Sequence, residues 1–393
     1  MNIELHVLQN FAPSCLNRDD TNSPKECLFG GHRRARMSSQ CDKRAIRKAF
    51  RDLALLPPEL LATRTKRLLE EVTKRLVAAG KDVAQARVVA ESVIKGAGLG
   101  VKEDGKTEYL LFLGESEIAA FAKACGDHWE ALSALAPALD EKAESNKKKK
   151  RAAKDAVPDA VKKALEKLLD GGKAADLALF GRMLADLPQK NIDAACQVAH
   201  AISTNKVGVE FDFYTAVDDL QQRGEDEGAG AGMMGTVEFN SACFYRYANI
   251  NLEQLKTNLG KDEELAKRTV EAFLRASVSA IPTGKQNSMA AQNPPSFILA
   301  VVRDNGLWSL TNAFVQPVHP DGKGNLVQKS IAATEDYWQK LIKVYGGNGI
   351  KVTPAVALDP ADLKVLPDAG SFENLVKIVL DNISFKPVKE GTK

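Results

Sequence analysis

The run TVEFNSACFYRYANIN, residues 236–251, decides the fold class of this chain. Its aromatic and β-branched side chains favour a strand. In residues 207–214, VGVEFDFY, apolar side chains occupy every second position, which also predicts a strand. An acidic, glycine-rich stretch at residues 218–235 separates the two runs. Together they predict a long β-hairpin.

Extended and helical patterns recur on both sides of this hairpin. The expected elements are strands at 3–11 and 297–302, a helix from about 39 to 57, and helices within 252–280. Residues 58–190 are rich in Ala, Leu, Lys and Glu and predict a mainly helical insertion. Residues 12–37 contain prolines and glycines at the spacing that is typical of a loop. The order predicts an α+β chain with a βαββαβ, ferredoxin-like core that carries an insertion after its first helix.

Two of these elements carry a finer pattern. In the first strand Ile3, Leu5 and Val7 alternate with Glu4 and His6, which is typical of a strand with one apolar face. Ser39-Gln40-Cys41-Asp42 fits a capping box at the start of the first helix. Spacing at 100° per residue separates an apolar face of that helix from a polar one. The apolar face holds Ala45, Ile46, Ala49, Phe50 and Leu53, and the polar face holds Gln40, Lys43, Arg44, Arg47 and Arg51.

The composition excludes several classes of protein. No apolar run approaches the roughly 20 residues of a membrane span, and the first residues lack the pattern of a secretory signal, so we expect a cytoplasmic protein without membrane contact. The six cysteines are scattered without a Cys-x-x-Cys pair, which predicts reduced thiols and no zinc site. Metalloprotease and serine-hydrolase motifs are absent from the sequence, and we expect no cofactor, no metal and no catalytic residue.

Two phosphate-loop patterns match by letter only. GVKEDGKT, residues 100–107, has Walker A spacing, but a helical stretch precedes it and an extended one follows, the reverse of the order that this motif needs. GAGMMG, residues 230–235, has dinucleotide-binding spacing but follows an acidic run instead of a strand. We therefore interpret both as chance matches.

Positive charge is concentrated near the N-terminus. The chain has 393 residues and a net charge of only +3, yet residues 33–51 hold eight Lys or Arg against one acid, Asp42, and so carry +7. Ser38, Ser39 and Gln40 add neutral donors where the helix begins, and helix N-termini attract anions. A solvated basic face is the plain alternative. The Gly-Gly-x-Arg-Arg-x-Arg run just before the helix favours binding of an RNA or DNA backbone.

Several blocks of the sequence resemble one protein family. These blocks are PSCLNRDD (13–20), FGGHRRARMSSQ (29–40), HAIST (200–204), FYTAVDDL (213–220) and FYRYANINL (244–252). They resemble the backbone subunit of type I-E CRISPR Cascade, the CasC family of the Cas-seven superfamily. The resemblance spans nearly the whole chain and is weakest in the helical insertion and the C-terminal tail.

The resemblance implies a hand-shaped protein with an RRM-like palm, helical fingers and a β-hairpin thumb. The expected segments are palm at 1–57, fingers at 58–190, palm at 191–206, thumb at 207–240 and palm at 241–393. Several copies would stack head to tail along one CRISPR RNA, as heterologous contacts that do not close allow. The implied partners are the CRISPR RNA, target DNA paired with that guide, further copies of the chain and other Cascade subunits.

The resemblance also implies a set of RNA-binding residues. The palm contacts to the guide backbone would be Arg18, Lys25, Ser38, Gln40, Lys43, Arg44 and Arg47. Met183, in the fingers, resembles the residue that wedges against a kinked base, and the alternative is a methionine of the core. Thr215 resembles the thumb residue at the kink.

Two other classes of function stay open at this point. Related backbone subunits in other CRISPR types cut RNA with a palm-loop aspartate, and Asp19 and Asp20 lie in such a loop, although they could also cap it. A guide-independent single-strand binder is the other alternative. The run Lys147–Arg151 predicts a solvated loop or a contact to target DNA.

Overall fold

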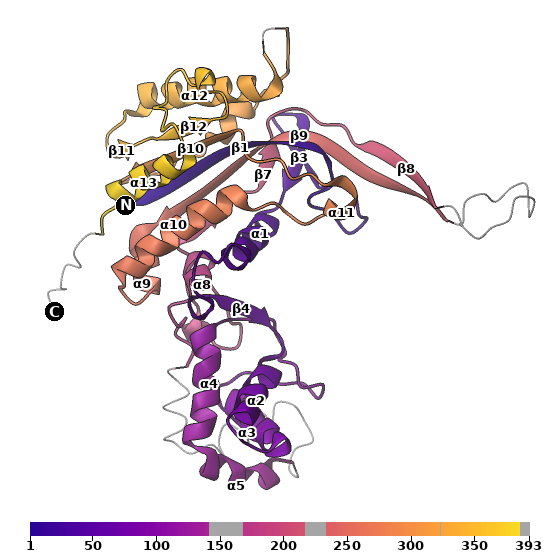
Figure 1. Ribbon diagram of the computed structural model, residues 1–393, viewed down its shortest axis with the longest axis vertical. Helices are drawn as coiled ribbons and strands as arrows, with labels where there is room; N and C mark the ends of the chain where they lie inside the picture. The colour runs from indigo at the N-terminus through magenta and orange to yellow at the C-terminus, as the bar shows by residue number, and fades with distance from the viewer. Residues whose placement is uncertain (141–167, 217–232, 323, 386–393) are drawn as a thin grey trace, which may run out of the picture. The chain divides into compact units, whose positions relative to one another are not determined.

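The computed structural model describes residues 1–140, 168–216, 233–322 and 324–385 (Figure 1). The chain divides into two compact units, which we describe separately. The first unit comprises Met1–Leu55, Gln197–Asn251 and Val270–Lys393, and the second comprises Leu56–Cys196 and Leu252–Thr269. The division into palm, fingers and thumb stays a prediction. The Lys147–Arg151 run and the rest of residues 141–167 of the expected helical insertion lie outside the described residues.

A large antiparallel sheet forms the first unit and gives the chain its mixed α+β class. The strand order is β11-β10-β1-β9-β7-β3-β2, while β12 also pairs with β10, and β6 and β8 with β9. The strands are β1 (Asn2–Ser14), β2 (Glu26–Phe29), β3 (His32–Met37), β6 (Cys196–Val198), β7 (Ala201–Ser203), β8 (Glu210–Ala216), β9 (Met233–Asn251), β10 (Phe297–Arg303), β11 (Ile350–Val352) and β12 (Ala355–Ala357). The four strands expected from the sequence are thus confirmed as β1, β8, β9 and β10.

Strand β9 belongs to both the sheet and the hairpin. Its residues Ala242–Asn251 pair with Asn2–Phe11 of β1, and Met233–Phe239 pair with Glu210–Ala216 of β8. The expected hairpin is therefore a continuation of the strand next to β1, as Figure 1 shows. A register shift between Phe11 and Ser14 separates these pairs from a last pair with β1, Ser14–Asn240.

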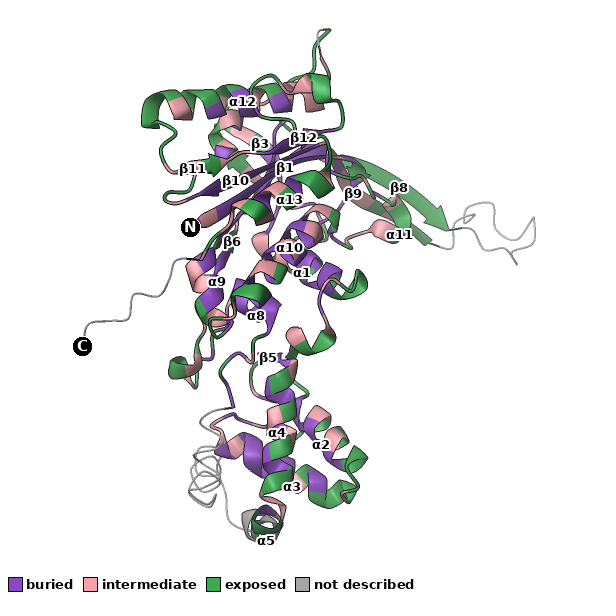
Figure 2. Cartoon of the chain, turned by 60° about the vertical axis from the view of Figure 1, so that its left-hand side comes forward, coloured by how far each residue is buried: buried purple, intermediate pink, exposed green. Residues whose placement is uncertain are grey.

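Helices cover both faces of the sheet (Figure 2). Ile46 of α1 and Ser277 of α10 lie with Leu5 and Val7 on one face. Trp338 of α12 packs with the residues of the other face, such as Leu8, Tyr245 and Leu299. The helices that include residues of this unit are α1 (Ser39–Asp52), α10 (Glu263–Ser279), α11 (Gln286–Met289), η3 (Leu310–Phe314), α12 (Leu326–Tyr345), η4 (Pro360–Asp362) and α13 (Phe372–Asn382).

Both faces of β1 are buried, although its sequence indicates only one apolar face. Glu4 and His6 are fully buried because α12 and η3 cover their side of the sheet. Glu4 accepts hydrogen bonds from the Tyr247 hydroxyl at 2.8 Å and the Trp308 amide at 2.6 Å. Burial raises the pKa of the Glu4 carboxyl, although these hydrogen bonds act to lower it. His6 Nδ1 lies 2.8 Å from the Tyr245 hydroxyl. Burial lowers the pKa of His6 to about 3, so its ring is neutral.

The segment expected as a loop at 12–37 contains a second hairpin, so that prediction was wrong in part. Strands β2 and β3 pair from Glu26–Ala35 to Phe29–His32. Gly30 and Gly31 form the two-residue connection, with φ of 58° and 78°. Two consecutive positive φ angles are what a type I′ turn needs, and glycine adopts them without strain. The arginines that follow therefore lie on a strand.

The second unit is mainly helical, as its composition predicts. Its elements are η1 (Pro58–Leu60), β4 (Ala62–Thr65), α2 (Leu68–Ala78), α3 (Val83–Gly96), β5 (Leu111–Gly114), α4 (Glu115–Asp127), α5 (Trp129–Asp140), α8 (Ala175–Phe180), η2 (Pro188–Lys190) and α9 (Leu252–Asn258). Leu69, Val93 and Phe121 bring α2, α3 and α4 into one apolar core. The Walker-like segment lies between α3 and β5, so the interpretation as a chance match holds.

The structure also bears on the cysteines, on membrane-spanning helices and on metal sites. All six cysteines are free thiols, as the sequence predicts. Within the described ranges every helix is too short or too polar to cross a bilayer. In the same residues no three His, Cys, Asp or Glu side chains are grouped so that they could hold a metal ion.

The buried His6 gives a testable dependence of stability on pH. In the unfolded chain His6 has the ordinary histidine pKa of about 6.5. Between about pH 6.5 and 3, His6 is therefore protonated in the unfolded chain but neutral in the folded one. The free energy of unfolding should therefore fall as the pH falls through this window, by up to about 1.4 kcal/mol per pH unit. His6→Gln should flatten the slope, measured by urea unfolding between about pH 7 and pH 4. An equal slope in the variant would contradict this account.

Candidate nucleic-acid interface

The start of α1 and the loop before β2 are joined through Asn17. The Asn17 side-chain oxygen accepts from the Ser38 amide at 2.9 Å, and its backbone oxygen accepts from the Lys25 amide at 2.9 Å. Arg18 is exposed beside it and donates to the Asn22 side chain at 3.0 Å. The structure thus brings Arg18 and Lys25 to the first turn of α1, although they are far from it in sequence.

Helix α1 begins one residue earlier than the expected capping box. Ser38 is the N-cap, and its hydroxyl accepts from the Cys41 amide at 3.4 Å. Asp42 does not cap the helix; it is buried against the sheet, with its carboxylate 4.0 Å from Arg246. Burial raises the pKa of Asp42, and Arg246 opposes that rise. Arg246 also donates to Gln9 at 2.8 Å, which ties the first turn of α1 to β9 and β1.

The polar face of α1 is only partly exposed. Gln40 and Arg44 are exposed and Lys43 is half-buried, as a surface contact requires. Arg47 is 9% exposed, so the prediction that it belongs to an open polar face was wrong. Helical spacing shows which side chains of one helix share a face. It does not show which of them other segments of the chain cover. Ser38 is also buried, with its hydroxyl engaged as the cap.

The arginines of β3 have separate roles. Arg34 is fully buried and donates to the carbonyls of Ser203, Thr204 and Phe314 at 3.0, 2.7 and 2.7 Å. It therefore connects three segments of the first unit and is not available to a ligand. Arg33 pairs with Glu26 at 2.5 Å. The surface charge of this segment is consequently smaller than the +7 counted from the sequence.

Asp19 caps the loop that holds Arg18. One of its carboxylate oxygens accepts from the Thr21 hydroxyl at 2.8 Å, the Thr21 amide at 2.9 Å and the Ser23 amide at 3.0 Å. These bonds, led by that from the Thr21 hydroxyl, lower the pKa of the Asp19 carboxyl. This is the capping role that the sequence leaves open for it.

Thr215 lies on a hairpin face with exposed apolar side chains. Phe211, Phe213 and Thr215 alternate along β8, so they project from the same face. Met234 pairs with Thr215 across the hairpin. Phe211, Phe213 and Met234 are 67%, 65% and 66% exposed, which is unusual for side chains of this size. The sequence placed Phe211 and Phe213 on one strand, but it could not show that their face is uncovered.

Met183 is exposed, which excludes the alternative of a core methionine. Its side chain is 82% exposed although both neighbouring side chains are buried. The preceding Gly181 has φ of 74°, and a Cβ there would lie 2.7 Å from the Ile192 carbonyl oxygen. Reciprocal backbone bonds of 2.9 Å between Arg182 and Ile192 fix the following residue. The local backbone therefore holds Met183 outward.

A buried ion pair holds this segment in place. Arg182 donates to both Glu117 carboxylate oxygens at 2.9 and 2.8 Å, and both side chains are 1% exposed. Glu117 also accepts from the Gly114 and Gly171 amides, each at 2.8 Å. Because each charge has several partners, the pair is well compensated. We call it the Arg182–Glu117 clamp.

Loss of the clamp should unfold the second unit more readily. Arg182→Met leaves the Glu117 charge buried without its partner, which should lower the free energy of unfolding by about 3–5 kcal/mol. Met183→Ala, one residue away, is the matched control and should change it by no more than about 0.5 kcal/mol. Urea unfolding of both variants measures this difference. Equal, small effects would show that the clamp does not stabilise the unit.

Comparisons with known proteins cover nearly the whole chain. Residues 3–377 match the model of the family described as CT1975-like protein. A chain of a "CRISPR RNA-guided surveillance complex, pre-nicking" is 31% identical with a TM-score of 0.80, and the match covers 97% of this chain and 99% of that one. A chain of a "CRISPR RNA-guided surveillance complex" is 25% identical with a TM-score of 0.69, covering 98% and 100%. A search of curated proteins found no match.

Proposed function

The chain belongs to the CT1975-like family, and on this premise we propose that it is the CRISPR RNA-binding backbone subunit of a type I-E Cascade surveillance complex. The observation that carries the proposal is the likeness, over 97% of the chain, to a chain of an RNA-guided surveillance complex. In this role several copies polymerise along one guide RNA beside the other Cascade subunits in the cytoplasm. They hold its backbone and present its bases to target DNA in antiviral defence.

The strand order supports a ferredoxin-like, RRM-like palm. In a βαββαβ unit the last strand lies beside the first, and the third lies on the other side of the first. Here β10, β1, β9 and β7 are neighbours in that order, and α1 and α10 share one face.

The proposed guide contacts are those whose side chains reach solvent. Arg18, Gln40 and Arg44 are exposed, and Lys25 and Lys43 are half-buried. Cations at a helix start suit phosphate oxygens and read no sequence. Ser38 contributes by capping that helix start, and the largely covered Arg47 is the weakest of these contacts.

Thr215 and Met183 are the proposed kinking residues. Thr215 is flanked by exposed Phe213 and Met234, and apolar side chains of this kind stack on or wedge between unstacked bases. Within the described hairpin the charged residues are Glu210, Asp212 and Glu238, all acidic. The proposed hairpin contacts are therefore made by shape and apolar surface, not by charge.

We propose no catalytic role for Asp19 and Asp20. The three hydrogen bonds to one oxygen of Asp19 favour a loop cap over a nuclease ligand. Incubation of the assembled complex with complementary RNA and magnesium should give no cleavage. Cleavage that Asp19→Ala and Asp20→Ala abolish would contradict a purely scaffolding role.

The guide contacts can be tested through their dependence on salt. Lys43→Ala combined with Arg44→Ala should weaken guide retention and lower the slope of log affinity against log salt by about 1.4, since each lost single-strand phosphate contact removes about 0.7. The matched control, Lys340→Ala with Lys343→Ala, removes the same charge from exposed positions of α12 and should leave the slope unchanged. Filter binding over a salt series measures both. Equal slopes in the two variants would refute the proposed palm contacts.

A further inference from the structure

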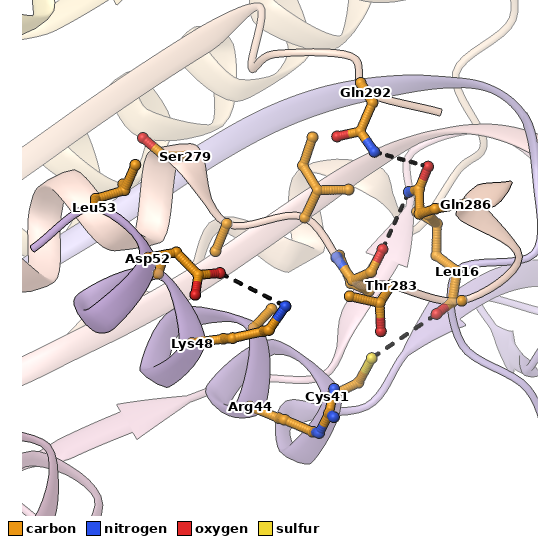
Figure 3. Close-up of a pocket in the computed structure, with 16 residues that line it drawn as sticks. Leu16, Cys41, Arg44, Lys48, Asp52, Leu53, Ser279, Thr283, Gln286 and Gln292 are labelled. Atoms are coloured by element: carbon orange, nitrogen blue, oxygen red, sulfur yellow. Dashed lines mark hydrogen bonds and ion pairs between the residues drawn. The ribbon is translucent and has the colours of Figure 1, made fainter. Parts of the chain in front are cut away.

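A pocket of 350 Å³ lies beside α1, on the flank of its polar face (Figure 3). One wall is α1 from Cys41 to Asp52 together with the following Leu53, and the other is the segment from Ser279 to Gln292. All its lining residues belong to the first unit. We call it the α1 pocket. Its volume is at the lower end of the roughly 300–1,000 Å³ of small-molecule sites.

The lining combines an apolar floor with a polar rim. Leu16, Ala49 and Ile281 are among the aliphatic residues of the floor. Thr283 and Gln292 line the pocket with exposed side chains and offer a hydroxyl and an amide. A flat apolar ring with polar edges needs this combination, because its faces pack on aliphatic groups and its edges exchange hydrogen bonds.

The electrostatics of the pocket favour an anion at its rim. Arg44 and Lys48 point from α1 toward the pocket, and Lys48 pairs with Asp52 at 3.6 Å (Figure 3). Arg44 is exposed at the border between the pocket and the proposed guide contacts. The Cys41 thiol adds no negative charge, because burial raises its pKa to about 11.

The second wall of the pocket is preorganised at a conformational cost. Lys285 and Ala290, at the two ends of α11, have φ of 51° and 47°, which non-glycine residues adopt rarely. Gln286 secures the segment between them, since its amide donates to the Pro282 carbonyl at 3.1 Å and the Ala291 carbonyl at 3.2 Å. Gln292 in turn donates to Gln286 at 3.0 Å. Strained segments that are held this firmly concentrate at ligand sites.

We propose that the α1 pocket receives one unstacked nucleobase of the guide RNA, with the adjoining phosphate on Arg44. This inference rests on the proposed function and adds a site for one base of the guide that has left the stack. Single-stranded RNA is recognised through bases that leave the stack and enter pockets. The aliphatic floor, the amide and hydroxyl rim and the neighbouring cation together match one nucleotide.

The test uses the assembled complex with 4-thiouridine placed at each guide position in turn. After irradiation, mass spectrometry should find crosslinks to the peptides that contain Cys41–Lys48 or Ile281–Gln292. Within the stretch of guide that one copy of the chain covers, only one nucleotide position should form them. Thr283→Trp fills the pocket and should reduce these crosslinks about tenfold. Asn287→Trp, on the same segment but outside the lining, is the matched control and should leave them unchanged.

Guide retention, measured in the same samples, separates the two proposals. Retained guide without crosslinks to these peptides would overturn the proposal that the α1 pocket binds a base, while leaving the proposed function intact. Retained guide with crosslinks that Thr283→Trp does not reduce would also overturn the proposed base site. Ala49→Met fills the pocket from its other wall and should reduce the same crosslinks, so it tests the site independently. A wild-type complex that retains no guide would contradict the proposed function itself.

Discussion

The pairing of β9 with β1 sets the geometry of the first unit. Ten backbone pairs from Asn2–Asn251 to Phe11–Ala242 fix the register of these central strands. The same 19-residue strand then leaves the sheet and forms the hairpin with β8. A slip of one residue would exchange the two faces of β9 and move both its core side chains and the hairpin face. One register therefore sets the position of Thr215 and its apolar neighbours.

Buried polar pairs then place the remaining functional side chains. Asp42 and Arg246 tie the start of α1 to the sheet, and the Arg182–Glu117 clamp holds the segment that exposes Met183. Arg34 joins β3 to two other segments through carbonyl groups. Arg182 and Arg34 are buried, whereas Met183 and Arg33, the residues next to them in sequence, are exposed. The basic segment near the N-terminus is thus partly scaffold and partly surface.

Much of this arrangement could be predicted from the sequence, because strand alternation and helix spacing are local signals. The runs at 207–214 and 236–251 predicted the hairpin, whereas Met183 was singled out only by the family resemblance. The burial of Glu4, His6 and Arg47 could not be predicted, since it depends on distant segments that cover them. The hairpin β2–β3 was missed because the Gly30-Gly31 turn was interpreted as loop punctuation. The α1 pocket requires residues more than 200 positions apart.

The proposed function requires that this chain holds one defined guide RNA. The most direct test is to purify the assembled complex under native conditions, extract its RNA, and determine the length and sequence of every molecule. We expect RNA of uniform length with shared ends and a variable guide segment. RNA of heterogeneous length and unrelated sequence would contradict it and would favour a guide-independent single-strand binder.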